Sequence, residues 1–178
     1  METGLGFLKD QVDNAVMQHA AFIDSLVAHE SEVQDQRFRD LCARHIPRMQ
    51  QHQRMLEELR HQLGGAAPGE VSITGTVKRL AGNAVGVATE LADSAPQSDY
   101  QYLVSDIVMA RQSEDTFKTF REAGRTLGIA ALARLGDIAE RHHDDYVKEA
   151  NRLAQQMFVE HARGAEQVAR SVTSQAEA

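Results

Sequence analysis

Apolar residues recur at alternating spacings of three and four over four long stretches of this sequence, and this periodicity constrains the fold more than any other feature. Such spacing places side chains on one face of an α-helix, so each stretch predicts an amphipathic helix. The first stretch covers residues 5–30, with Leu8, Val12, Phe22 and Leu26 on its apolar face. Only three prolines occur in 178 residues, which leaves room for helices of this length.

Local signals predict where the second helix begins and ends. Ser31 and Gln34 form a capping-box pattern, in which the serine accepts a hydrogen bond from the first turn and the glutamine reaches back. Gly64 and Gly65 end the helix, because glycine tolerates the left-handed turn that follows. Pro47 lies inside the helix and is expected to kink it. The predicted apolar face consists of Phe38, Cys42, Met49, Leu56, Leu59 and Leu63.

A long connection follows. Residues 64–75 are rich in Gly, Pro, Ser and Thr and predict a loop, and a second break surrounds Pro96. Between them, residues 76–92 contain many alanines and glycines and predict a shorter helix that packing must hold in place. Ser98 and Gln101 then repeat the capping-box pattern and predict the start of a third helix.

The third helix is predicted to end near Gly124, and the fourth to run from about Ile129 to Ala162. A short turn joins them, as in antiparallel neighbours, so the order is hairpin, long connection, hairpin. We therefore predict an all-α fold over residues 1–163. It is an antiparallel four-helix bundle with one long crossover connection that contains a shorter fifth helix. Residues 164–178 are small and polar and are expected to fray.

Composition excludes several classes of function. The formal net charge of −7 argues against non-specific binding of nucleic acid, which needs a basic face. Cys42 is the only cysteine, so no intrachain disulfide forms and a reducing compartment is expected. We find no secretion signal and no apolar run near the ~20 residues of a membrane span. A cytoplasmic protein of bacterial type, without a membrane partner, is the resulting expectation.

Polar residues interrupt the apolar faces of all four predicted helices. Buried carboxylates are costly unless they are paired or bind a cation. Imidazoles and carboxylates together suit iron, manganese or zinc. Glu140 and His143 stand one helical turn apart as Glu-x-x-His, on one face of the fourth helix. The predicted metal ligands are His19, His45, His52, Glu114, Glu140 and His143.

The rise of a helix, ~1.5 Å per residue, predicts which of these residues are level. If the first two helices fold back near residues 32–33, His19 lies beside His45. If the second hairpin turns near residue 126, Glu114 lies within a turn of Glu140. Each hairpin thus brings polar groups to the middle of the bundle, and Phe117 would wall the site from water.

A purely structural interpretation stands beside this one. A histidine on an apolar face is more often a hydrogen-bonded core residue than a ligand, and Glu114 could pair with Arg111 or His142. Cys42 and His45 have the helical spacing of a nucleophilic dyad, although a lone core cysteine usually acts as a small hydrophobe.

Three stretches carry a family resemblance: RHIPRMQQHQRMLEELRHQLGG, DIVMARQSEDTFKTFREAGRTLG and IAERHHDDYVKEANRL. With them, the span from about residue 5 to 160 resembles the ferritin-like superfamily, and is most similar to small bacterial groups of unknown function that include the YciF-like proteins. The resemblance implies a di-metal site with a Glu from each of two helices and Glu-x-x-His from each of the other two.

Only half of that ligand pattern is present. Glu114, or Asp115 in the alternative register, matches the carboxylate of the third helix, and the fourth helix has its Glu-x-x-His. Gln18 and His19 stand where the first helix should supply a Glu, and Met49 replaces the Glu of the second. This pattern is compatible with a histidine-rich or single-metal variant, and also with a bundle that has lost its metal.

We therefore predict a ferritin-like protein that binds iron, manganese or zinc, with a redox or stress-protective role, as a homodimer or other homo-oligomer. The alternative is a non-catalytic, metal-free bundle that acts through self-association or a protein partner. Residues 76–92 favour that alternative, because alanine and glycine let another helix approach closely.

Overall fold

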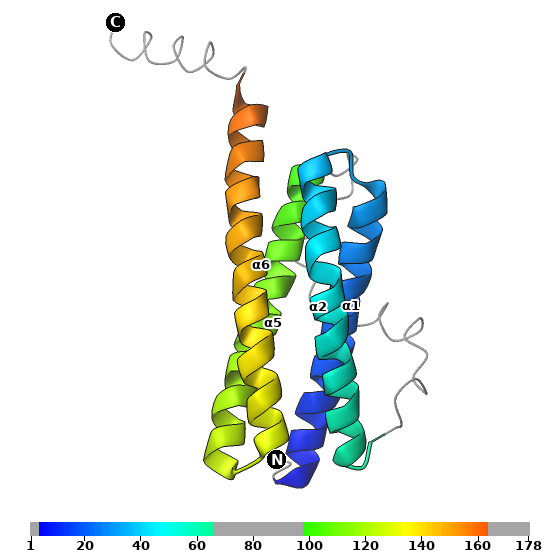
Figure 1. The fold of residues 1–178 in the computed structure, drawn as a ribbon, viewed down its shortest axis with the longest axis vertical. Helices are drawn as coiled ribbons and strands as arrows, with labels where there is room; N and C mark the ends of the chain where they lie inside the picture. Colours follow the sequence, from blue (N-terminus) through cyan, green and yellow to red (C-terminus); the bar gives the residue numbers. More distant parts are fainter. Residues whose placement is uncertain (1–3, 66–97, 164–178) are drawn as a thin grey trace, which may run out of the picture.

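The computed structural model describes residues 4–65 and 98–163, which form four α-helices (Figure 1). They are α1 (Leu5–Glu32), α2 (Gln36–Gln62), α5 (Asp99–Leu127) and α6 (Ala130–Ala162). The predicted all-α bundle is thereby confirmed for this part of the chain. The predicted short helix at 76–92 and the predicted fraying of 164–178 lie outside the described residues.

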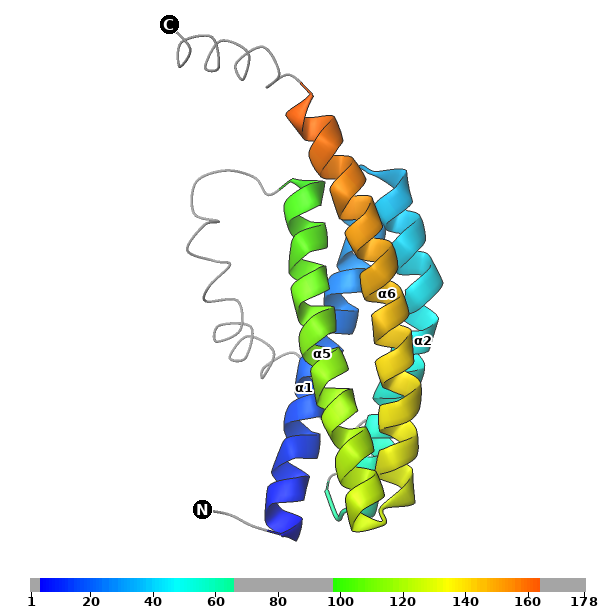
Figure 2. The ribbon, with the colours of Figure 1, turned by 90° about the vertical axis from the view of Figure 1, so that its left-hand side faces the viewer.

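The four helices pack as a square, in which α1 and α6 each contact both α2 and α5 (Figures 1 and 2). Near the end of α2, Arg60 lies 4.0 Å from Asp13 in the first turns of α1. At the opposite end, the Asp99 carboxylate accepts hydrogen bonds from the backbone N–H groups of Gln34 and Asp35. The chain therefore leaves α2 at one end of the bundle and enters α5 at the other, and these two helices run in the same direction (Figure 1).

The start of α2 differs from the prediction. Ser31 lies in the last turn of α1, and the predicted capping box with Gln34 does not form. Instead, Asp35 caps α2 by accepting a hydrogen bond of 2.8 Å from the Arg37 backbone N–H. The turn comes later because Val33 is buried, and α1 must continue far enough to place this side chain in the core.

The start of α5 matches its sequence signal. The Ser98 hydroxyl accepts from the Gln101 backbone N–H, and the Gln101 side chain accepts from the Ser98 backbone N–H. The helix ends later than predicted, at Leu127, because Gly128 adopts the left-handed conformation with φ 69°. Gly124 is a packing residue inside the helix and does not end it.

Replacing Ser98 with alanine is expected to destabilise the protein by about 1 kcal/mol, the usual loss of a side-chain N-cap. Ser31→Ala is the matched control, because the Ser31 hydroxyl bonds only to carbonyls of its own helix, and its removal should change stability by less than ~0.5 kcal/mol. Urea unfolding of the two variants measures the difference. Equal losses would contradict the assignment of the caps.

The core consists of two apolar clusters, one toward each end of the bundle. The cluster nearer the α1–α2 turn includes Phe22, Leu26 and Phe38, and the other includes Val12 and Phe117. His19 lies between them, since its ring contacts both Phe22 and Phe117. His19 therefore lies at mid-bundle, between the two apolar clusters.

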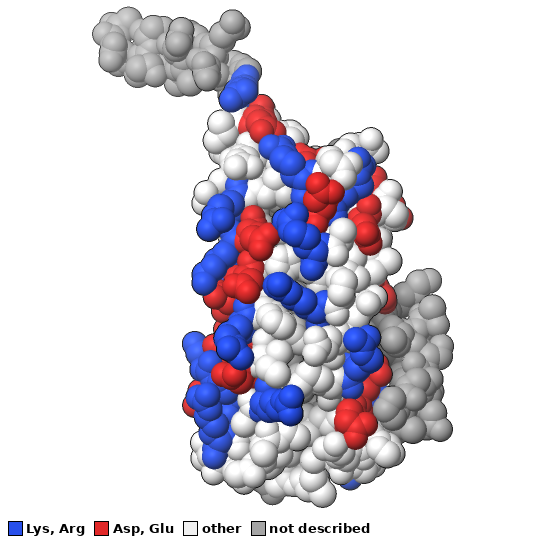
Figure 3. All heavy atoms as spheres, in the orientation of Figure 1, with Lys and Arg blue, Asp and Glu red and all other residues white. Residues whose placement is uncertain are grey.

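Charged side chains of both signs intermix over α2 and α6 on the face shown in Figure 3. Ion pairs join the two helices there: Arg37 with Glu160, Arg44 with Glu149, and Arg48 with Asp145. Among the described residues, no helix combines the length and apolar character needed to cross a membrane.

Candidate metal centre

Three buried histidines from three different helices meet in the middle of the bundle. His19 comes from α1, His52 from α2 and His143 from α6, and each is at most 1% exposed. One ring nitrogen of each histidine lies within 4.8 Å of the corresponding nitrogen of the other two. Among the described residues, no carboxylate oxygen or sulfur joins them at this distance.

A glutamine from α2 sets the protonation of His19. The Nδ1 atom of His19 lies 3.1 Å from Gln53 Oε1. The amide nitrogen of Gln53 donates to the Val16 carbonyl and to Glu57 Oε1, at 3.3 Å and 3.1 Å. Because the amide nitrogen serves those two acceptors, the amide oxygen faces His19 and accepts its Nδ1–H. The Nε2 atom of His19 is then an unprotonated nitrogen with a lone pair.

The other two histidines also bond through only one ring nitrogen. His143 Nδ1 lies 2.8 Å from the Ala139 carbonyl oxygen, which can only accept, so this nitrogen carries the proton. His52 Nε2 lies 2.8 Å from Nδ1 of His142, the residue that precedes His143 on α6. Each contact leaves the opposite nitrogen of the ring available.

The available nitrogens are His19 Nε2, His52 Nδ1 and His143 Nε2, and each is buried without a hydrogen-bond partner in the described part of the chain. Leaving a buried polar atom unpaired costs about 1–3 kcal/mol. The three histidines come from three helices and meet in one place, so a cation that accepts a lone pair from each ring would account for all three unpartnered atoms. A hydrogen bond from the outer nitrogen to a carbonyl oxygen is also the usual support of a metal-bound histidine.

The electrostatics of the cluster favour neutral rings. Burial lowers the pKa of His19 to about 4, against a smaller raising effect of Gln53. Burial, together with the neighbouring His19 and His142, lowers the pKa of His52 to about 3. Burial also lowers the pKa of His143 well below its ordinary value. All three rings are therefore neutral at neutral pH, which is the form that binds metal ions.

Aromatic rings enclose the cluster. The Phe117 ring centre lies 5.4 Å, 6.0 Å and 5.1 Å from those of His19, His52 and His143. Phe22 covers His143 from another side, at 5.8 Å. This apolar surrounding strengthens electrostatic interactions inside it and penalises uncompensated charge.

The spacing of the nitrogens suits a small transition-metal ion after slight closure. Because the three ligand nitrogens lie within 4.8 Å of one another, an ion between them can lie within about 2.8 Å of each, whereas zinc–nitrogen distances are ~2.0–2.1 Å. Small rotations of the three rings would provide the difference. Three histidine ligands leave a fourth position of a tetrahedral ion for water or an anion.

His45 does not lie beside His19, where the rise per residue of the two helices predicted it. Its Nε2 atom lies 3.4 Å from Glu149 Oε1, and its ring packs at 5.3 Å against Tyr146. The residue level with His19 on α2 is Gln53, next to His52. The turn between α1 and α2, at residues 33–35, lies slightly further along the chain than assumed, which accounts for part of this shift.

The two predicted carboxylate ligands also lie outside the histidine cluster. Glu114 is half-buried and pairs with Arg111 at 2.8 Å, whereas Ser113 takes the inward position on α5. Glu140 forms an ion pair with Arg121 across the α5–α6 interface. Both carboxylates are therefore engaged by arginines. Of the six predicted ligands, His19, His52 and His143 are brought together.

Sequence reasoning missed Asp106, which is fully buried on α5. Its carboxylate accepts a hydrogen bond from the Ser25 hydroxyl and contacts His29 Nδ1, each at 2.7 Å. The sequence does indicate that Asp106 faces inward. It lies seven residues before Ser113 and three residues after Leu103, so the three share one face of the helix.

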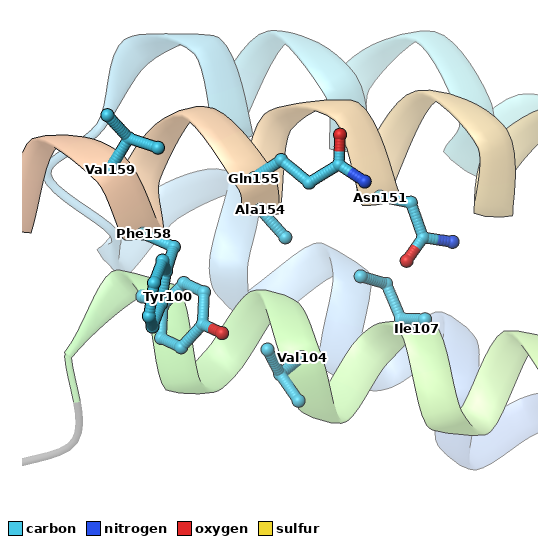
Figure 4. A pocket seen from close by; sticks show the side chains of 8 residues that line it. All are labelled: Tyr100, Val104, Ile107, Asn151, Ala154, Gln155, Phe158 and Val159. Atoms are coloured by element: carbon cyan, nitrogen blue, oxygen red, sulfur yellow. The ribbon is translucent and has the colours of Figure 1, made fainter.

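A shallow groove lies at one end of the bundle, between α5 and α6 (Figure 4). Its volume is about 350 Å³, and its polar groups are the Tyr100 hydroxyl and the amides of Asn151 and Gln155. Phe158 and Val159 line it and are more than half exposed. The groove contains no member of the histidine cluster.

Comparison of the chain with protein-family models, curated proteins and solved structures finds no match. The geometry of the three histidines therefore carries the functional interpretation.

Proposed function

We propose that this protein binds one transition-metal ion through His19, His52 and His143. The observation that carries the proposal is that three buried, neutral histidines from three helices converge, and that one ring nitrogen of each has no hydrogen-bond partner among the described residues. Three neutral imidazoles without a carboxylate suit zinc and similar ions better than manganese, which favours oxygen ligands. Zinc is therefore the ion that we propose first.

The helix directions support a ferritin-like arrangement, because a connection that runs from one end of the bundle to the other is characteristic of that plan. The ligand set differs from the four-carboxylate pattern of the superfamily, since Glu114 and Glu140 are engaged by Arg111 and Arg121. We therefore propose a single ion in a ferritin-like bundle in place of a di-iron centre. When bound, zinc would polarise a water or anion in its fourth position.

Zinc added to the chelator-treated protein is expected to bind at one ion per chain, as measured by elemental analysis and calorimetry. Because only the folded state presents the three nitrogens together, zinc at a hundredfold excess over its dissociation constant should stabilise the protein by ~2.7 kcal/mol. The His143→Leu variant should lose stoichiometric binding and the thermal shift. Metal-free His143→Leu should be at least as stable as the parent, because the unpartnered Nε2 is removed.

His161→Leu is the matched control, since His161 is exposed near the far end of α6. It should bind zinc like the parent. If the parent protein neither retains zinc nor gains stability from zinc, nickel or copper, the proposal is wrong.

The alternative function, self-association of a metal-free bundle, is favoured by the exposed apolar side chains of the groove in Figure 4. Light scattering during size-exclusion chromatography distinguishes the two. A stable oligomer that dissociates on Phe158→Glu, together with an absence of metal binding, would support this alternative.

A further inference from the structure

The hydrogen bond of His52 differs in kind from those of the other two candidate ligands. His19 and His143 face oxygen atoms of an amide and a backbone carbonyl, which only accept, so their Nδ1 atoms must carry the proton. His52 Nε2 faces Nδ1 of His142, which can either donate or accept. The protonation of His52 is therefore decided by a partner that allows two arrangements.

Only one of these arrangements makes His52 a ligand. If His142 Nδ1–H donates to His52 Nε2, the neutral His52 ring carries its proton on Nδ1, the nitrogen left toward the cluster. If His52 Nε2–H donates to an unprotonated His142 Nδ1, the Nδ1 atom of His52 presents a lone pair. Both arrangements are neutral and contain the same number of protons, so they differ only in where the protons lie.

We propose that His142 is a positioning residue that accepts the Nε2–H of His52 and thereby holds His52 Nδ1 in the form that ligates the ion. This inference rests on the proposed function. His142 and His143 are consecutive on α6, so this helix supplies one ligand directly and orients a second ligand carried by α2. The centres of the two rings are 5.0 Å apart and their planes are inclined by 24°, which is compatible with a hydrogen bond in the planes of the rings.

The test compares two substitutions of His142. His142→Leu removes the acceptor, whereas His142→Asn restores an acceptor, because the asparagine Oδ1 occupies nearly the place of histidine Nδ1. Zinc affinity is measured by competition with a chromophoric chelator, and His161→Leu is the control. Loss of a group that orients a metal ligand typically weakens metal binding 10–100-fold. We expect that loss for His142→Leu, and binding within about threefold of the parent for His142→Asn.

The visible absorption of the cobalt(II)-loaded proteins reports the coordination directly. The parent and His142→Asn should share one tetrahedral spectrum, and His142→Leu should show a different or weaker one. Thermal unfolding of the metal-free variants verifies that each is folded. This inference is wrong if His142→Leu binds zinc as tightly as the parent, or if both variants bind zinc equally weakly. The proposed function stands in either case. Absence of zinc binding by the parent overturns both.

Discussion

Acidification from pH 7 to pH 4 is expected to unfold the metal-free protein, with most of the loss of stability between about pH 6 and pH 4. The cause is the burial of neutral histidines, since the folded-state pKa of His19 is lowered to about 4 and that of His52 to about 3. In the unfolded chain both titrate near 6.5. Between these values the unfolded state binds more protons than the folded state, so stability falls as pH falls.

The expected loss in the free energy of unfolding is large relative to the total stability of a domain. Each unit of pKa difference corresponds to about 1.4 kcal/mol, so the two histidines together lose on the order of 8 kcal/mol when both are fully protonated. A domain typically has about 5–15 kcal/mol of stability in total. The stability that the two neutral histidines contribute is complete above their pKa in the unfolded chain. It is lost progressively as the pH falls toward their pKa values in the folded protein. His143 adds in the same direction.

Urea unfolding at intervals of half a pH unit measures this dependence. The double variant His19→Leu and His52→Leu should show a much flatter profile between pH 6 and pH 4, whereas His161→Leu should keep the steep one. Surface carboxylates such as Asp35 and Glu160, whose pKa values are lowered by Arg37, act in the same direction at lower pH. A steep profile that persists in the double variant would assign acid lability to those carboxylates and not to the buried histidines.

Gly136→Ala is expected to destabilise the protein by roughly 3 kcal/mol or more, at the upper end of overpacking effects. A Cβ atom at this position would lie 2.5 Å from the Phe117 carbonyl oxygen and 2.3 Å from the Arg121 backbone nitrogen. Both are backbone atoms of α5, so only a displacement of α5 from α6 relieves the contact. The expected loss of stability is opposite in sign to the usual gain of ~1 kcal/mol when a glycine inside a helix becomes alanine.

Gly128→Ala is the matched control in the same hairpin. Gly128 has φ 69°, and a Cβ there would meet no atom within 4 Å, so only the strain of the left-handed conformation is introduced. A loss of about 1–2 kcal/mol is expected for this variant. Denaturant unfolding of both proteins measures the difference. Because Phe117 also covers the three histidines, Gly136→Ala should weaken zinc binding as well, whereas Gly128→Ala should not.

The helices were predictable because their signals are local. The spacing of Val12, Phe22 and Leu26 indicates a helix wherever that segment lies, and the Ser98–Gln101 capping box involves four consecutive residues. The start of α2 was mispredicted for a reason that is not local. Ser31 and Gln34 have a valid capping pattern, but burial of Val33 in the core keeps Ser31 in the last turn of α1.

The candidate metal centre was predictable in part. His19, His52 and His143 stand out because they interrupt apolar faces, and periodicity alone finds them. Periodicity cannot tell His52 from His45, which occupies the same face two turns earlier, because that choice depends on the position of the turn and on the relative heights of the packed helices. Nor can it show that Glu114 and Glu140 are engaged by arginines.

By itself, the sequence determined that this chain forms long amphipathic helices whose buried faces carry histidines, because helix formation and the inward or outward direction of a side chain depend on neighbours within one or two turns. Only the tertiary structure decided which histidines meet, which of their nitrogens lie unpaired, and where glycine lets α5 approach α6. Those features depend on the registry of helices far apart in the chain, and this registry follows from packing of the whole bundle.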